Sequence, residues 1–356
     1  MLRLFVLFSL VLFTPPAHGQ SVTVVSYGGS FAQASEKAIH SRFEVESGIS
    51  VDMDHFNGGL AQVRSQVEIG KVYWDVVDFE MAELVRACDE GLIVPIETER
   101  FSPGSDGTPA HKDFDSGTIT ECGVGKLYFS TVFAYNEKNI GDRKPKTIRD
   151  FFDMAGFPGR RGLRRVPQGN FEFALMADGV RVEEVYAVLD TETGVDRAFE
   201  KLDTIKEHVV WWETGAQPPQ LLADGEVAMT TAYNGRIFNA QALEGQPFVI
   251  VWDGQILKMG AYGIVEGTQN LEAAHRFVDF ATSARSMAEL TRYIAYSPTR
   301  RSAMQLISVH AETGVEMMPH LPTGPQNMAR ALHNNWQWWS DNGEEINERF
   351  STWLTK

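Results

Sequence analysis

Beyond its first 20 residues, the sequence has no apolar run long enough to cross a bilayer. Residues 1–20 themselves have an early Arg3, an apolar run over 4–13 and a small-x-small ending at 17–19. This pattern is typical of a secretory signal peptide, and it contains no cysteine that could carry a lipid anchor. We therefore expect residues 1–19 to be removed near Gly19, leaving a protein exported to the periplasm without direct insertion into a membrane.

Basic side chains are few relative to acidic ones. Lysine and arginine number 32 against 47 aspartates and glutamates, for a formal net charge of −15. A molecule of that charge repels phosphate backbones, so nucleic acid is not expected as a partner. Acidic surfaces mostly serve solubility, so the balance does not by itself indicate a cationic ligand.

Cysteine is nearly absent, with Cys88 and Cys122 as the only two. Their spacing fits no zinc-binding pattern. In an oxidising compartment an isolated pair favours a disulfide, which would stabilise the fold by about 3–4 kcal/mol on the chain-entropy model. Two buried free thiols remain the alternative.

The common catalytic and nucleotide-binding motifs are also missing. The chain has no G-x-S-x-G, H-E-x-x-H, C-x-x-C, G-x-G-x-x-G or phosphate-loop pattern. Nine histidines are scattered, and the loose group of His310, His320 and His333 does not have the spacing of a metal site. We expect no catalytic residues, no metal and no cofactor. An exported hydrolase or lyase remains the alternative of another class.

What the sequence does contain is a regular alternation of strand-like and helix-like segments. Three apolar runs over residues 21–26, 49–56 and 74–79 are separated by helical patterns. This β-α-β-α-β order predicts an α/β fold with a mainly parallel sheet covered on both faces. A second alternating region follows, and from residue 271 onward the pattern is mainly helical, with an apolar stripe at Trp339, Ile346, Phe350, Trp353 and Leu354 that predicts a docked helix.

The stretch "SYGGSF" joins the first predicted strand to the first predicted helix. A turn of this kind presents free backbone N–H groups, which favour an anionic or polar group. Gly28, Gly29 and Ser30 therefore have two interpretations, as the lip of a ligand site or as a simple turn.

Several segments in order resemble the spermidine/putrescine-binding family of bacterial periplasmic solute receptors. They are "YGGSFAQASEKAIHSRFEVESGISVDMDHFNGGLAQVRSQVEIGKVYWDVVDFE", "FSTVFAYN", "LLADGEVAMTTAYNGR", "VIVWDG" and "IAYSPT". The resemblance implies a two-lobed receptor that closes on a small-molecule ligand and delivers it to an inner-membrane ABC permease. It places residues 21–132 and 262–297 in the first lobe, and 133–261 and 298–356 in the second, with hinge strands between them. We expect the protein to be a monomer.

The same resemblance implies a set of cleft residues. Tyr27, with Gly28 to Ser30, matches the family's aromatic after the first strand, and Glu80 follows the third strand. Tyr233 and Asn234 match an aromatic-Asn-Gly site, and Tyr296 matches a cleft tyrosine. The remaining candidates are Gln168, Thr214, Gly215, Arg236 and Lys258.

The departures from the family pattern bear on the ligand. Polyamine receptors pair their ligand's ammonium groups with acidic side chains, because a buried cation needs a charged partner. Here Val166, Gly169 and Gly260 stand at those places, and Lys258 replaces a tryptophan. The exchange favours a carboxylate-bearing or zwitterionic ligand, with Arg164, Arg165 and Arg236 close in sequence to cleft segments. A true putrescine or spermidine receptor remains the alternative.

Overall fold

The computed structural model describes residues 20–356, so the signal peptide predicted for residues 1–19 lies outside the described residues. The described strands are β1 (Ser21–Ser26), β2 (Ser50–His55), β3 (Val76–Glu80), β4 (Gly123–Asn136), β5 (Arg161–Arg164), β6 (Val209–Trp212), β7 (Met229–Tyr233), β8 (Phe248–Ile264), β9 (Ser297–Pro298) and β10 (Leu332–His333). All ten join one sheet in the order β2-β1-β3-β8-β4-β7-β5-β6, with β9 beside β4 and β10 beside β8.

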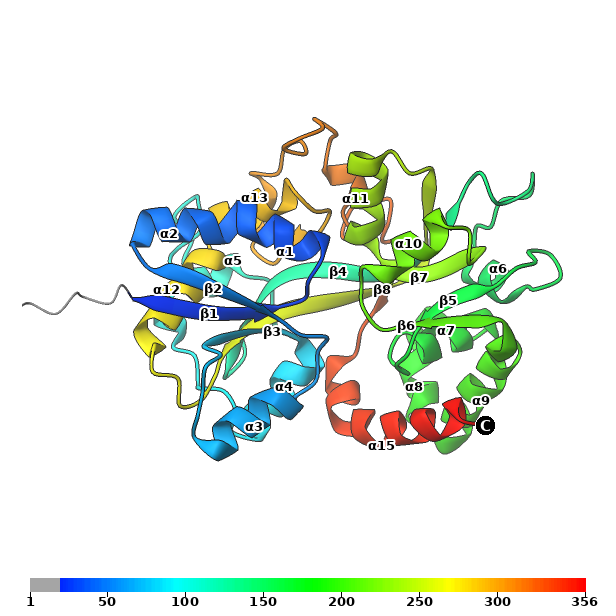
Figure 1. Cartoon of the computed structure of the whole chain (residues 1–356), viewed down its shortest axis with the longest axis horizontal. Coiled ribbons are helices and arrows are strands. Elements are labelled where there is room, and N and C mark those ends of the chain that lie inside the picture. Colours follow the sequence, from blue (N-terminus) through cyan, green and yellow to red (C-terminus); the bar gives the residue numbers. More distant parts are fainter. Residues whose placement is uncertain (1–19) are drawn as a thin grey trace, which may run out of the picture.

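Helices cover both faces of this sheet (Figure 1). One face carries α1 (Ser30–Ser35), α2 (Ser41–Ser47), α10 (Gln217–Ala223), α11 (Asn234–Glu244) and α13 (Ala284–Thr291), with a π-helical turn joining α1 to α2. The opposite face carries α3 (Ala61–Ile69), α4 (Met81–Asp89), α7 (Asn170–Ala177), α8 (Val185–Leu189), α9 (Glu192–Asp203) and α15 (Trp336–Leu354). The remaining helices are α5 (Ala110–Asp113), α6 (Ile148–Phe152), α12 (Leu271–Ala281) and α14 (Arg301–Met304). The predicted α/β class is thus confirmed.

Two parallel sets of strands lie at the ends of the sheet. In the first, β1 pairs in parallel with β2 and β3, as the alternation of the first 80 residues predicts. In the second, β5 pairs in parallel with β6 and β7. The inner strands β1 and β3 are largely apolar and buried, whereas β2, at the edge of the sheet, is polar and largely exposed.

The two longest strands connect these sets. β4 has 14 residues and β8 has 17, and they pair antiparallel along nearly their whole length. β8 also pairs with β3, while β4 also pairs with β7. Register shifts interrupt the β4–β8 ladder near Gly125 and near Thr131. Such irregularities bend a strand, and these lie where the strands pass from one parallel set to the other.

The helical C-terminus confirms the predicted docked helix. Trp339, Ile346, Phe350 and Trp353 of α15 are buried in one apolar core with α7 and α9, and Leu354 packs against it. The chain before α15 differs from the prediction, because residues 305–335 form mostly turns with only a short 3-10 helix and β10. These turns follow from Gly314, Gly324 and the prolines of "MMPHLPTGP", which do not suit a continuous helix.

The disulfide expected between Cys88 and Cys122 is present, so the alternative of two free thiols is wrong. It ties the last turn of α4 to the residue before β4. Within residues 20–356, no helix is both long and apolar enough to cross a membrane.

Candidate functional site

Six strand ends converge on one cavity of about 340 Å³ between the two parallel sets. β1, β2 and β3 end at its first wall, and β5, β6 and β7 end at its second. Ligands of open α/β sheets generally bind beyond the carboxyl ends of the strands. The lining residues are Tyr27, Gly28, Gly29, Phe31, His55, Phe56, Asn57, Asp78, Phe79, Glu80, Leu127, Phe129, Arg164, Glu213, Thr214, Gly215, Ala216, Tyr233, Arg236, Gly260 and Tyr296.

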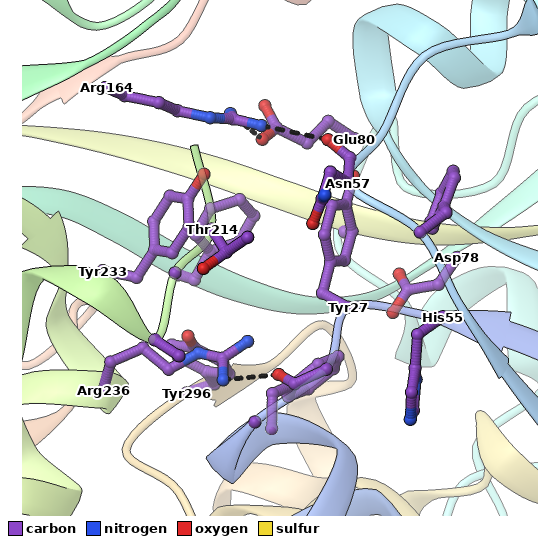
Figure 2. A pocket seen from close by; sticks show the side chains of 18 of the residues that line it. Tyr27, His55, Asn57, Asp78, Glu80, Arg164, Thr214, Tyr233, Arg236 and Tyr296 are labelled. Atoms are coloured by element: carbon purple, nitrogen blue, oxygen red, sulfur yellow. Dashed lines mark hydrogen bonds and ion pairs between the residues drawn. The ribbon is translucent and has the colours of Figure 1, made fainter. Parts of the chain in front are cut away.

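The glycines after β1 face a guanidinium group across the cavity. Arg236 of α11 donates from Nη1 to the carbonyl oxygen of Gly28 at 2.6 Å (Figure 2). Gly29 has a φ of 72°, and a Cβ there would lie 2.6 Å from Arg236 Nη1. Glycine is therefore required both for the backbone conformation and for the close approach of the arginine.

Arg236 is the cavity's least compensated charge. Its side chain is largely buried, and its Nε has no hydrogen-bond partner among the described residues. No carboxylate of residues 20–356 forms an ion pair with it. A buried guanidinium without an anion favours a negatively charged group in its neighbourhood.

Glu80, at the end of β3, differs from Arg236 in having partners of opposite charge. Its Oε2 lies 3.0 Å from Lys258 Nζ and its Oε1 lies 3.2 Å from Arg164 Nη1. Burial alone would raise the pKa of Glu80, but the two cations hold it below its ordinary value. Glu80 is therefore ionised and already paired on both oxygens.

Asp78 is a second paired acid on the same wall. Its Oδ2 accepts from Lys126 Nζ and from Ser26 Oγ, each at 2.6 Å. Lys126 is itself buried and lies 4.0 Å from the centre of the Tyr262 ring. The acids of the first wall thus have lysine partners on β8, the neighbour of β3, and on β4, the next strand along the sheet.

Aromatic rings line much of the remaining surface. Phe129 lies edge-on to Tyr233 with ring centres 5.4 Å apart, and its centre is 5.9 Å from that of Tyr296. Tyr27 packs on Phe56 at 5.1 Å. Burial raises the pKa of the hydroxyl groups of Tyr27, Tyr233 and Tyr296, so they are neutral hydrogen-bonding groups at ordinary pH.

The structure brings together most of the residues singled out in the sequence. Those that line the cavity are Tyr27, Gly28, Gly29, Glu80, Thr214, Gly215, Tyr233, Arg236 and Tyr296.

Four of the sequence candidates lie elsewhere. Ser30 begins α1 and does not line the cavity. Lys258 is buried behind Glu80. The side chain of Asn234 bridges Ser130 N and the carbonyl of Ala295, a structural role. Gln168 lines an adjoining hollow next to α15, which shares Asn57, Glu80 and Arg164 with the cavity.

The sequence candidates omit several lining residues. His55 is the last residue of β2 and Asn57 follows that strand, so their position at the end of the second strand of the parallel set was the available signal. Asp78 lies two residues before Glu80 and so on the same face of β3. Arg164, noted in the sequence only as near the cleft, lines the cavity and reaches across it to Glu80 and to the carbonyl of Asn57 (Figure 2). In the described part of the chain, no three His, Cys, Asp or Glu side chains are placed to hold a metal.

Comparisons with known proteins agree with this architecture. The chain is 41% identical over 340 residues to the gamma-aminobutyric acid-binding protein of Pseudomonas aeruginosa, covering 96% of this chain and 92% of that protein. It is 23% identical over 302 residues to the putrescine/cadaverine-binding protein of the same organism, covering 79% of this chain and 81% of that protein.

Among solved structures, a GABA receptor superposes with a TM-score of 0.80 at 30% identity, covering 94% of this chain and 98% of that one. Residues 38–323 also match the model of the family described as bacterial extracellular solute-binding protein. Both relatives are named as binding proteins, and the matched family model is likewise a binding-protein family rather than an enzyme family. With its fold, its cavity at the strand ends and these matches, the chain belongs to the bacterial extracellular solute-binding protein family.

Proposed function

We propose that this protein captures a small amino acid with an unbranched spacer, of which γ-aminobutyrate is the leading candidate, and delivers it to an ABC importer. The ligand's carboxylate binds at Arg236, and the tyrosine and phenylalanine rings enclose its aliphatic part. Of the residues selected from the sequence, the nine that line the cavity form this binding site.

The observation that carries this proposal is the distribution of charge around the cavity. Glu80 has Arg164 and Lys258 as partners, and Asp78 has Lys126, whereas Arg236 bonds to the carbonyl of Gly28 and has no carboxylate partner among the described residues. A dication such as putrescine would bring two positive charges into a buried site where both acids of β3 already have a lysine partner and Arg236 adds an uncompensated cation, which is costly. A carboxylate would instead supply the anion that Arg236 lacks.

The names of the relatives support the same choice. A protein 41% identical over nearly the whole chain is named for gamma-aminobutyric acid, and so is the solved structure at 30% identity. The protein named for putrescine and cadaverine is only 23% identical. The resemblance to polyamine receptors seen in the sequence therefore reflects the shared architecture, and we do not extend it to the ligand.

Binding involves closure of two lobes about β4 and β8. In this proposal residues 21–132 and 262–297 form the first lobe, and 133–261 and 298–356 form the second. Arg236 and Arg164 both approach the first wall from the second, as their contacts with Gly28 and Glu80 illustrate. The mature protein acts as a periplasmic monomer after cleavage near Gly19.

Titration calorimetry on the mature protein tests the proposal. We expect micromolar or tighter binding of 4-aminobutanoate and no measurable binding of putrescine or spermidine at the same concentrations. Dialysis against denaturant and refolding beforehand would remove any molecule that co-purifies. Tight binding of putrescine without any response to 4-aminobutanoate would contradict the proposal and restore the polyamine alternative.

A further inference from the structure

One oxygen of Asp78 is left free on the wall of the cavity. Both hydrogen bonds of this carboxylate, from Ser26 and Lys126, enter Oδ2. Among residues 20–356, no donor is bonded to Oδ1. Glu80, by contrast, has a cation on each of its oxygens. Of the two acids on β3, Asp78 is therefore the one with acceptor capacity to spare.

Gly260 keeps the space in front of this oxygen open. Gly260 lies on β8 directly opposite Glu80, and it lines the same cavity as Asp78. A Cβ at this position would lie 3.7 Å from Asp78 Oδ1 and 3.4 Å from Leu127 Cδ1. Those are ordinary contact distances, so a methyl group would fit without a clash but would occupy the volume beside Oδ1.

Asp78 and Arg236 lie well apart along the cavity. Asp78 is hydrogen-bonded to Ser26, whereas Arg236 is hydrogen-bonded to Gly28, two residues further along the chain. Two extended residues span about 7 Å, so the chain positions that bond the two anchors are separated by up to roughly that length. Figure 2 shows them on opposite sides of Tyr27.

Building on the proposed function, we propose that Asp78 Oδ1, left accessible by Gly260, binds the ammonium group of a ligand whose carboxylate binds Arg236. Such a pair of anchors selects ω-amino acids, in which several methylene groups separate the two charges. An α-amino acid carries both groups on one carbon and cannot reach both anchors. Lys126 is a positioning residue in this arrangement, because it holds the Asp78 carboxylate from behind.

Two variants and two ligands test this assignment. 4-Aminobutanoate has both charged groups, whereas butanoate has only the carboxylate. Asp78→Asn removes the charge, and Gly260→Ala fills the space beside Oδ1 while leaving the Asp78–Lys126 pair intact. Gly141→Ala is the matched control, because Gly141 has open space around its Cβ position. Affinities are measured by calorimetry, with competition titrations for weak ligands and circular dichroism to verify folding.

We expect both variants to weaken 4-aminobutanoate binding by about tenfold or more, the usual effect of losing a hydrogen bond to a charged group. Butanoate binding should change by less than about threefold, and the control should bind both ligands as the wild type does. Equal losses for the two ligands, or no loss in Gly260→Ala, would overturn the ammonium site but leave the proposed function standing. Failure of the wild type to bind 4-aminobutanoate would overturn both.

Discussion

The role inferred for a side chain from the sequence can change once its partners in the structure are known. In the sequence, Lys258 is a cation that replaces a tryptophan of the family pattern, and Glu80 is a predicted cleft residue after the third strand. In the structure the two are bonded to each other at 3.0 Å. The preference for an anionic ligand therefore rests on Arg236, which has no such partner among residues 20–356.

Glu83 gives a prediction at this scale, because it is an acid in an unfavourable place. Its Oε1 accepts from the backbone N–H of Gly59, while its Oε2 is buried without a partner among the described residues. Burial, reinforced by the negative charge of Glu80, raises the pKa of Glu83 to about 7, although Gly59, Arg164 and Lys258 oppose the shift.

The sign of the resulting pH dependence follows from linkage. With a folded pKa above the unfolded one, the folded state binds the proton more strongly, so this group's contribution to stability falls as the pH rises from about 4.5 to 7. The full effect is up to about 3 kcal/mol, reduced by any solvent exposure. Glu83→Gln should therefore be more stable than the wild type at pH 8 and should lose that advantage at pH 4.5.

Thermal unfolding measured across this pH range checks the prediction. Glu68→Gln, an exposed position on α3, is the matched control and should follow the wild-type profile throughout. A difference between Glu83→Gln and the wild type that stays constant from pH 4.5 to 8 would contradict a titration of Glu83.

At the scale of whole elements, local sequence pattern and long-range pairing contribute differently. The strands near residues 21–26 and 74–79 could be predicted, because their apolar runs and intervening helices are local features. The antiparallel pairing of β4 with β8 could not, since it joins segments more than 100 residues apart by backbone hydrogen bonds that carry no sequence signature. The register shifts that bend these strands could not be predicted from the sequence either.

The candidate site divides in the same way. Tyr27, Glu80 and Tyr233 could be found because each lies at the end of a recognisable strand or directly after it. The pairing of Asp78 with Lys126 could not, because it depends on which strands become neighbours. The net charge of −15 did not help to predict the site either, since the charges around the cavity belong to a few buried groups.

The disulfide leads to a prediction about how α4 is held to the sheet. Cys88→Ser with Cys122→Ser should lower the free energy of unfolding by about 3–4 kcal/mol, because the unfolded chain regains the entropy of an open loop of 34 residues. Neither cysteine lines the cavity, so ligand affinity should be unchanged.

Denaturant unfolding measures the difference in free energy of unfolding between the double variant and the wild type. Added reductant should destabilise the wild type and leave the double variant unaffected; a double variant as stable as the oxidised wild type would contradict the prediction.

At the scale of the whole molecule, two arginines from the second wall connect to the first. Arg164 reaches Glu80 and the carbonyl of Asn57, while Arg236 reaches the carbonyl of Gly28. Each contact requires the two walls to be close together. A ligand that adds a carboxylate at Arg236 would bind the closed arrangement better than an open one, and that difference in affinity is what shifts the equilibrium toward closure.

Arg236→Gln is the decisive variant for this view of closure. It removes the charge that we assign to the ligand's carboxylate, so 4-aminobutanoate affinity should fall by about 10–100-fold. In small-angle X-ray scattering, saturating 4-aminobutanoate should reduce the radius of gyration of the wild type, whereas the same concentration should leave the variant unchanged. Arg276→Gln, an exposed position on α12, is the matched control and should close as the wild type does. If the variant closed at the same ligand concentration as the wild type, Arg236 would have no part in coupling binding to the movement of the lobes, and the carboxylate would have to be placed elsewhere in the cavity.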